Sequence, residues 1–85
     1  MDRETPHDAV LRTEVALEIL NQARAIVTSR IHDLEAEDPE AAEALRVRRR
    51  TLVELQHCLR VEDCEAVIAT WGPWVRDESL FWREF

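Results

Sequence analysis

His57 and Cys58 are adjacent residues whose types could form a thiol nucleophile with its base, and Cys64 follows closely. Neighbouring residues on a helix point about 100° apart, so the His57 ring cannot make the hydrogen bond that would activate Cys58. Zinc sites use spacings such as Cys-x2-Cys or His-x3-His, and neither His7 nor His32 has a partner at such a spacing. We therefore expect no catalytic residue, no metal site, no cofactor and two reduced cysteines, which argues against an enzyme.

The densest basic run is Arg46, Arg48, Arg49 and Arg50, and Arg46, Arg49 and Arg50 share a broad side of a predicted helix. A basic helix face can follow a phosphate backbone. No neighbouring glycine, aromatic residue or second basic segment widens this patch, so a solvated face paired with carboxylates is the simpler interpretation. Nucleic-acid contact through Arg46, Arg49 and Arg50 remains the alternative.

All five aromatic residues lie in the last fifteen positions of the chain. Large rings are enriched at the centres of protein interfaces, which suggests a partner-binding tail. The same rings could instead fold back and cover the apolar face of the first helix, and both uses can coexist within one tail. The candidate partner-binding residues are Trp71, Trp74, Phe81, Trp82 and Phe85.

Composition places the 85-residue chain in the all-α class, as a single domain spanning residues 1–85. Helix-favouring residues dominate, and there is one glycine. Eighteen acidic residues face eleven basic ones, all arginine, giving a net charge of −7. This acidic balance disfavours general binding to nucleic acid or to anionic membranes. With no long apolar run and a polar start, the sequence favours a cytoplasmic protein without a membrane span.

The sequence predicts an antiparallel helical hairpin. Thr5 and Pro6 suit the start of a first helix over about 6–35, and Asp38 and Pro39 suit the start of a second over about 39–60, with a turn at 36–40. The apolar stripe of the second helix matches that of the first in reverse, as in an antiparallel coiled coil. This register pairs Leu17 with Leu59, Leu20 with Leu55, Ile31 with Leu45 and Leu34 with Ala41.

The apolar phase breaks near residue 61, where Glu62 and Asp63 occupy expected core positions. Either Asp63 caps a short third helix over about 63–71, which we favour, or one long helix turns its apolar face to another neighbour. On both accounts Gly72 and Pro73 end the helix and leave an aromatic tail over 72–85, whose last turns Asp77 or Ser79 could cap.

The first helix has more apolar surface than one partner helix can cover, because its apolar residues spread over roughly 200° of the helical wheel. We therefore expect a homodimer that joins two hairpins into a helical bundle, with self-association through Val15, Ile19 and Ile26. The predicted function is non-catalytic protein–protein interaction, as an adaptor, chaperone-like partner or inhibitor. The alternative is a small nucleic-acid-associated regulator or antitoxin-like protein.

Overall fold

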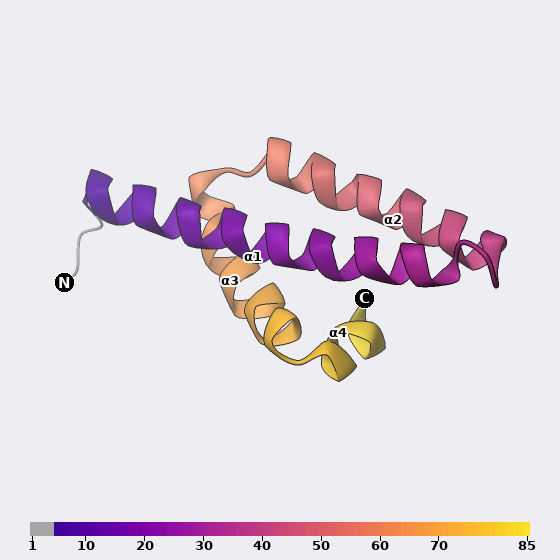
Figure 1. Cartoon of the computed structure of the whole chain (residues 1–85). Helices are drawn as coiled ribbons and strands as arrows, with labels where there is room; N and C mark the ends of the chain where they lie inside the picture. The colour runs from indigo at the N-terminus through magenta and orange to yellow at the C-terminus, as the bar shows by residue number, and fades with distance from the viewer. Residues whose placement is uncertain (1–4) are drawn as a thin grey trace.

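The computed structural model describes residues 5–85, which form four α-helices and no strand (Figure 1). The helices are α1 (Pro6–Leu34), α2 (Pro39–His57), α3 (Val61–Arg76) and α4 (Glu78–Glu84). The predicted all-α class is therefore confirmed for this part of the chain. Residues 1–4 of the predicted domain lie outside the described residues.

The first two helices begin where their capping residues predict. The Thr5 side chain accepts a hydrogen bond from the Asp8 amide, and the Asp8 carboxylate accepts one from the Thr5 amide. Pro6 lies in the first turn of α1. The Asp38 carboxylate accepts from the Ala41 amide, with Pro39 next in sequence. These caps satisfy amides that have no partner inside a helix, so short local sequences determine both helix starts.

The break near residue 61 is present, but its boundaries differ from the prediction. α2 ends at His57 rather than at residue 60, and α3 begins at Val61 rather than at residue 63. Asp63 is not the cap: it lies in the first turn of α3, where its carboxylate accepts a hydrogen bond from Arg60 Nε at 3.2 Å. This hydrogen bond and the charges of Asp63 and Glu62 raise the pKa of Arg60.

The prediction that Gly72 and Pro73 end the third helix is wrong, because α3 continues through both residues to Arg76. Gly72 does not adopt a positive φ and is buried on the face of α3 that meets Ile19 of α1. Proline inside a helix removes one backbone hydrogen bond. Trp74 and Val75 pack against the core immediately afterwards, and their burial offsets that loss.

The second half of the aromatic tail forms α4, in agreement with the predicted last helical turns. Asp77 caps this helix by accepting hydrogen bonds from the Ser79 and Leu80 amides. The cap turns the chain back, so that the Phe81 side chain is fully buried. A helix of seven residues is too short to be stable alone, so α4 depends on this packing.

α1 is the central helix, because it packs against both α2 and α3. Figure 1 shows α2 returning alongside α1 in the opposite direction, while α3 crosses beneath α1. Polar side chains link α1 to α2: Gln56 accepts a hydrogen bond from Arg24 Nη1 and donates one to Asn21, each at 2.8 Å. Arg24 Nε is buried without a hydrogen-bond partner among the described residues.

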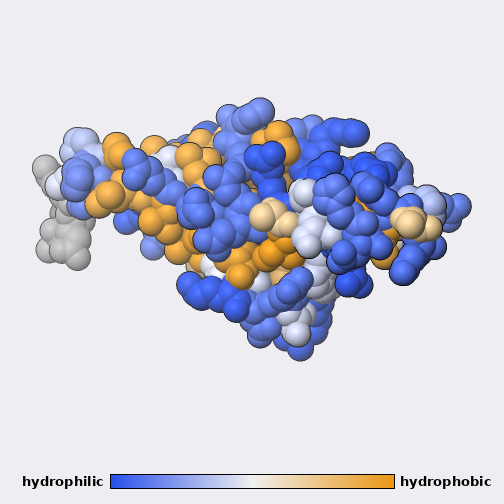
Figure 2. All heavy atoms as spheres, viewed as in Figure 1, coloured by the Kyte–Doolittle hydropathy of each residue, from blue (hydrophilic) through white to orange (hydrophobic). Residues whose placement is uncertain are grey.

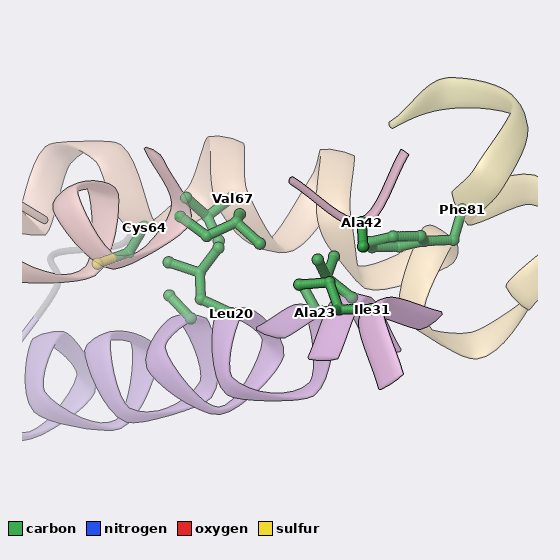
Figure 3. Packing of buried hydrophobic residues seen from close by; sticks show 10 residues of the cluster. Leu20, Ala23, Ile31, Ala42, Cys64, Val67 and Phe81 are labelled. Atoms are coloured by element: carbon green, nitrogen blue, oxygen red, sulfur yellow. The ribbon is translucent and has the colours of Figure 1, made fainter. Parts of the chain in front are cut away.

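The core joins all four helices around small side chains of α1 and α2. Ala16, Ala23 and Ala42 are fully buried, which lets neighbouring helices approach closely. Figure 3 shows the Phe81 ring reaching from α4 toward Ala42. The buried cluster consists of Ala16, Leu20, Ala23, Val27, Ile31, Ala42, Leu52, Cys64, Val67 and Phe81.

The molecule is elongated, with principal extents of 54, 23 and 14 Å. Its radius of gyration is 14.7 Å, whereas a compact domain of this length has about 12 Å. Within residues 5–85, no helix combines the length and the apolarity that crossing a bilayer requires.

Candidate protein-binding surface

Large apolar side chains are exposed mainly at one end of the molecule. Four of the five exposed large apolar residues of the described chain lie on the first turns of α1 or on the first residue of α3. Figure 2 shows apolar residues in orange along the first turns of α1, next to the grey N-terminal residues. We call this set the N-terminal apolar surface: Val10, Leu11, Val15 and Val61.

The difference in helix length explains this exposure. α1 has 29 residues and α2 has 19, so α2 ends before it reaches the first turns of α1 (Figure 1). α3 crosses α1 and covers only part of the helix there. The beginning of α1 therefore carries the apolar residues of a packed helix without a neighbour on every side.

A groove of about 450 Å³ runs along this surface between α1 and α3. Leu11, Val15 and Ile19 form its apolar floor with Val75 of α3. We call it the α1/α3 groove. Its charged lining residues are Glu14 and Glu18 on α1 and Arg76 on α3.

The charges of the groove have few partners within the chain. Glu18 accepts a hydrogen bond from Gln22 at 3.4 Å, but neither Glu14 nor Arg76 forms an ion pair or side-chain hydrogen bond with another described residue. Arg76 lies over Gly72, since a Cβ placed on Gly72 would be 3.8 Å from Arg76 Nη2 and 3.7 Å from Ile19 Cδ1. The guanidinium group and the Ile19 side chain therefore both approach Gly72, and Glu18 precedes Ile19 on α1.

A second, smaller hollow of about 200 Å³ adjoins the start of α3. Ala9, Val10 and Thr13 of α1 line it together with Val61. It shares Glu14 with the α1/α3 groove, so the two hollows flank the same turns of α1. An apolar surface with a charged edge is the usual composition of a protein-binding site.

The structure separates the three residues expected to mediate self-association. Val15 is 48% exposed and lines the α1/α3 groove. Ile19 is only 9% exposed and forms the inner wall of the groove, while Ile26 packs against the core. Of these three, Val15 is the residue that another chain can contact most fully.

The aromatic residues cluster with one another and with the chain's own helices. Phe81 is fully buried, and the other four rings are half-buried against the core. Phe81 stacks on Phe85 with centroids 4.9 Å apart, and Arg30 of α1 lies 5.6 Å from the centroid of Trp82. These contacts favour the folded-back interpretation of the tail. The remaining rings are Trp71 and Trp74, whose centroids are 4.8 Å apart.

The candidate nucleic-acid residues lie together, but two of them already have partners. Arg46 forms ion pairs with Glu35 and Glu43, each at 3.2 Å. Arg49 donates a hydrogen bond to the Thr28 hydroxyl at 3.0 Å. They line one shallow hollow with Arg50 and Val53. Phosphate binding by Arg46 or Arg49 would have to compete with these contacts.

The cysteines occupy different environments. Cys58 is exposed at the end of α2, whereas Cys64 is buried, with Sγ 3.3 Å from the Arg60 carbonyl oxygen and 3.6 Å from the Thr13 hydroxyl. Across residues 5–85, no group of three His, Cys, Asp or Glu side chains is placed to hold a metal ion.

Sequence reasoning missed most of the N-terminal apolar surface. Val10, Leu11 and Val61 were not singled out, although Leu11 and Val15 are one helical turn apart. The usable signal was the unequal length of the two helices, because it leaves the first turns of α1 without a partner. Comparison with protein-family models, with curated proteins and with solved structures found no match for this chain.

Proposed function

We propose that this protein is a non-catalytic protein–protein interaction protein that acts through its N-terminal apolar surface. It would serve as an adaptor, a chaperone-like partner or an inhibitor of another protein. The observation that carries the proposal is the concentration of four exposed large apolar residues at one end of an acidic chain. Burying such a patch against a partner removes apolar area from water at roughly 25 cal/mol per Å².

We further propose that the protein is a homodimer in which two α1–α2 hairpins join into a helical bundle. The exposed Leu11 and Val15 on α1 support this, because an uncovered apolar helix face usually packs against another chain. Two-fold pairing buries the same patch on both copies and is the commonest oligomeric symmetry. The α1/α3 groove, which Val15 lines, is the surface that we assign to self-association.

The proposal is tested by comparing two matched substitutions, Val15→Glu and Val47→Glu. Val15 is 48% exposed on the N-terminal apolar surface, and Val47 is 50% exposed on α2, away from it. Tagged wild-type and variant proteins capture partners from the host, and the captured proteins are quantified by mass spectrometry. We expect Val15→Glu to lose wild-type partners and Val47→Glu to retain them; equal capture by all three proteins contradicts the proposal.

The alternative proposal is a nucleic-acid-associated regulator that uses Arg46, Arg49 and Arg50. It has weaker support, since Arg46 and Arg49 already have partners and the net charge is −7. Phosphate contacts produce binding that falls steeply with salt. Retention on immobilised DNA at about 150 mM salt, lost in Arg46→Ala/Arg50→Ala, would favour the regulator over the adaptor.

A further inference from the structure

The two edges of the α1/α3 groove carry opposite charges. Glu14 and Glu18 lie on the α1 edge, and Arg76 lies on the α3 edge. Glu14 and Arg76 have no charged partner among the described residues. A groove with an acidic edge and a basic edge on the same molecule is complementary to a copy of itself.

We propose that a second copy of this chain occupies the α1/α3 groove, with its α1 parallel to the first and the two-fold axis running along them. This inference rests on the proposed function and adds the orientation and the charge pairs of the proposed homodimer. In this arrangement Leu11 and Val15 of each copy meet their counterparts. Glu18 of each copy then pairs with Arg76 of the other, and Glu14 lies one turn away.

The charge pattern selects the parallel orientation. A two-fold axis parallel to α1 brings the acidic edge of one copy against the Arg76 edge of the other. A two-fold axis perpendicular to α1 would place Glu18 near Glu18 and Arg76 near Arg76, and like charges across an interface oppose association. The positions along the groove also agree, because Arg76 and Ile19 both approach Gly72 and Glu18 precedes Ile19 on the same groove.

A charge exchange between chains tests the pairing. Glu18→Arg and Arg76→Glu should each weaken the homodimer by roughly tenfold, because two cross-chain pairs become repulsive. Mixing the two variants should restore association to near the wild-type affinity, since the mixed dimer contains only opposite charges. Pairing within one chain would not be rescued by mixing, so failure of rescue overturns the cross-chain pairs. Sedimentation equilibrium measures all four samples.

Cysteine cross-linking tests the orientation. In a Cys58→Ser background, Leu11→Cys and Gln22→Cys introduce thiols about 16 Å apart along α1. Parallel copies bring each thiol to its own counterpart, so both variants should form disulfide-linked dimers when oxidised. Antiparallel copies let at most one variant cross-link to itself. They also favour a mixed dimer when the two variants are combined. Thr51→Cys, at an exposed position of α2, is the control that should form no disulfide-linked dimer.

The outcomes separate this inference from the proposed function. A wild-type mass near 20 kDa with both self-cross-links supports the parallel dimer, since one chain is 10.0 kDa. A dimer with preferred mixed cross-links overturns the parallel orientation and leaves the function standing. A monomer at about 50 µM whose partner capture still depends on Val15 overturns the second copy as occupant. A monomer whose capture ignores Val15→Glu overturns both.

Discussion

The guanidinium carbon of Arg48 on α2 lies 4.1 Å from the centroid of the Phe85 ring, just beyond α4. The contact joins the second helix to the last described residue, across a core to which both Phe81 and Phe85 contribute. A cation held over an aromatic face is attracted to the negative face of the ring. This contact therefore links Phe85, at the end of the aromatic cluster, to α2.

We predict that Arg48→Ala lowers the free energy of unfolding by about 0.5–1 kcal/mol, the range for an exposed cation–π contact. Urea titration followed by circular dichroism measures the change. Arg50→Ala is the matched control, because Arg50 is exposed on the same helix and touches no aromatic ring. Equal effects of the two substitutions would contradict a specific role for Arg48.

We predict that Gly72→Ala stabilises the protein by about 0.5–1 kcal/mol, because alanine is the better residue inside a helix. Gly72 has no positive φ, and a Cβ there would meet its nearest neighbour, Ile19 Cδ1, at an ordinary 3.7 Å. If Gly72 were a left-handed helix stop, the same change would destabilise the protein. Thermal unfolding of the variant distinguishes these two outcomes. Ala66→Gly, at an exposed position of α3, is the control and should lower the stability.

We predict that Leu20 and Leu55 pair across the hairpin. Leu20 is fully buried, and Leu55 is half-buried against the same core. In a double-mutant cycle, Leu20→Ala and Leu55→Ala should show a coupling of about 0.5–3 kcal/mol, as neighbouring residues do. For Leu20→Ala and Leu45→Ala, the changes in the free energy of unfolding should be additive, since the register places Leu45 opposite Ile31. Coupling in the second pair alone would show that the register is shifted.

We predict that the folded protein has one reactive thiol. Cys58 is exposed and should react at once with an aromatic disulfide reagent, whereas buried Cys64 should react only as the chain unfolds. The reagent should therefore titrate one thiol in buffer and two in concentrated urea. Cys58→Ser should abolish the fast reaction without changing the oligomeric state. Fast reaction of both thiols in buffer would mean that the reagent reaches Cys64 in the folded protein.

Sequence information was sufficient where structure depends on local hydrogen bonds. Both helix starts were predicted correctly from their capping residues, Thr5 with Pro6 and Asp38 with Pro39, because a cap is formed within a few residues. The end of α2 was placed three residues late, since residues 58–60 contain neither glycine nor proline. Local signals therefore marked both helix starts and the end of α1 better than the end of α2.

The errors arose where tertiary packing outweighs local preference. Gly72 and Pro73 together favour a helix end, yet burial of Trp74 and Val75 keeps α3 intact through them. The candidate surface was found only through Val15, because exposure of Val10, Leu11 and Val61 depends on where α2 stops. No pattern within a single helix contains that information.

The central position of α1 has a consequence for synthesis on the ribosome. α1 is made before α2, whereas α3, which packs against the apolar face of α1, is made after α2. Cys64 contacts Thr13 across 51 positions of sequence, so this coverage waits until α3 has left the exit tunnel. At about 5–20 residues per second, the nascent hairpin spends several seconds with that face open. During this interval we expect the hairpin to be open to chaperones that bind exposed apolar segments.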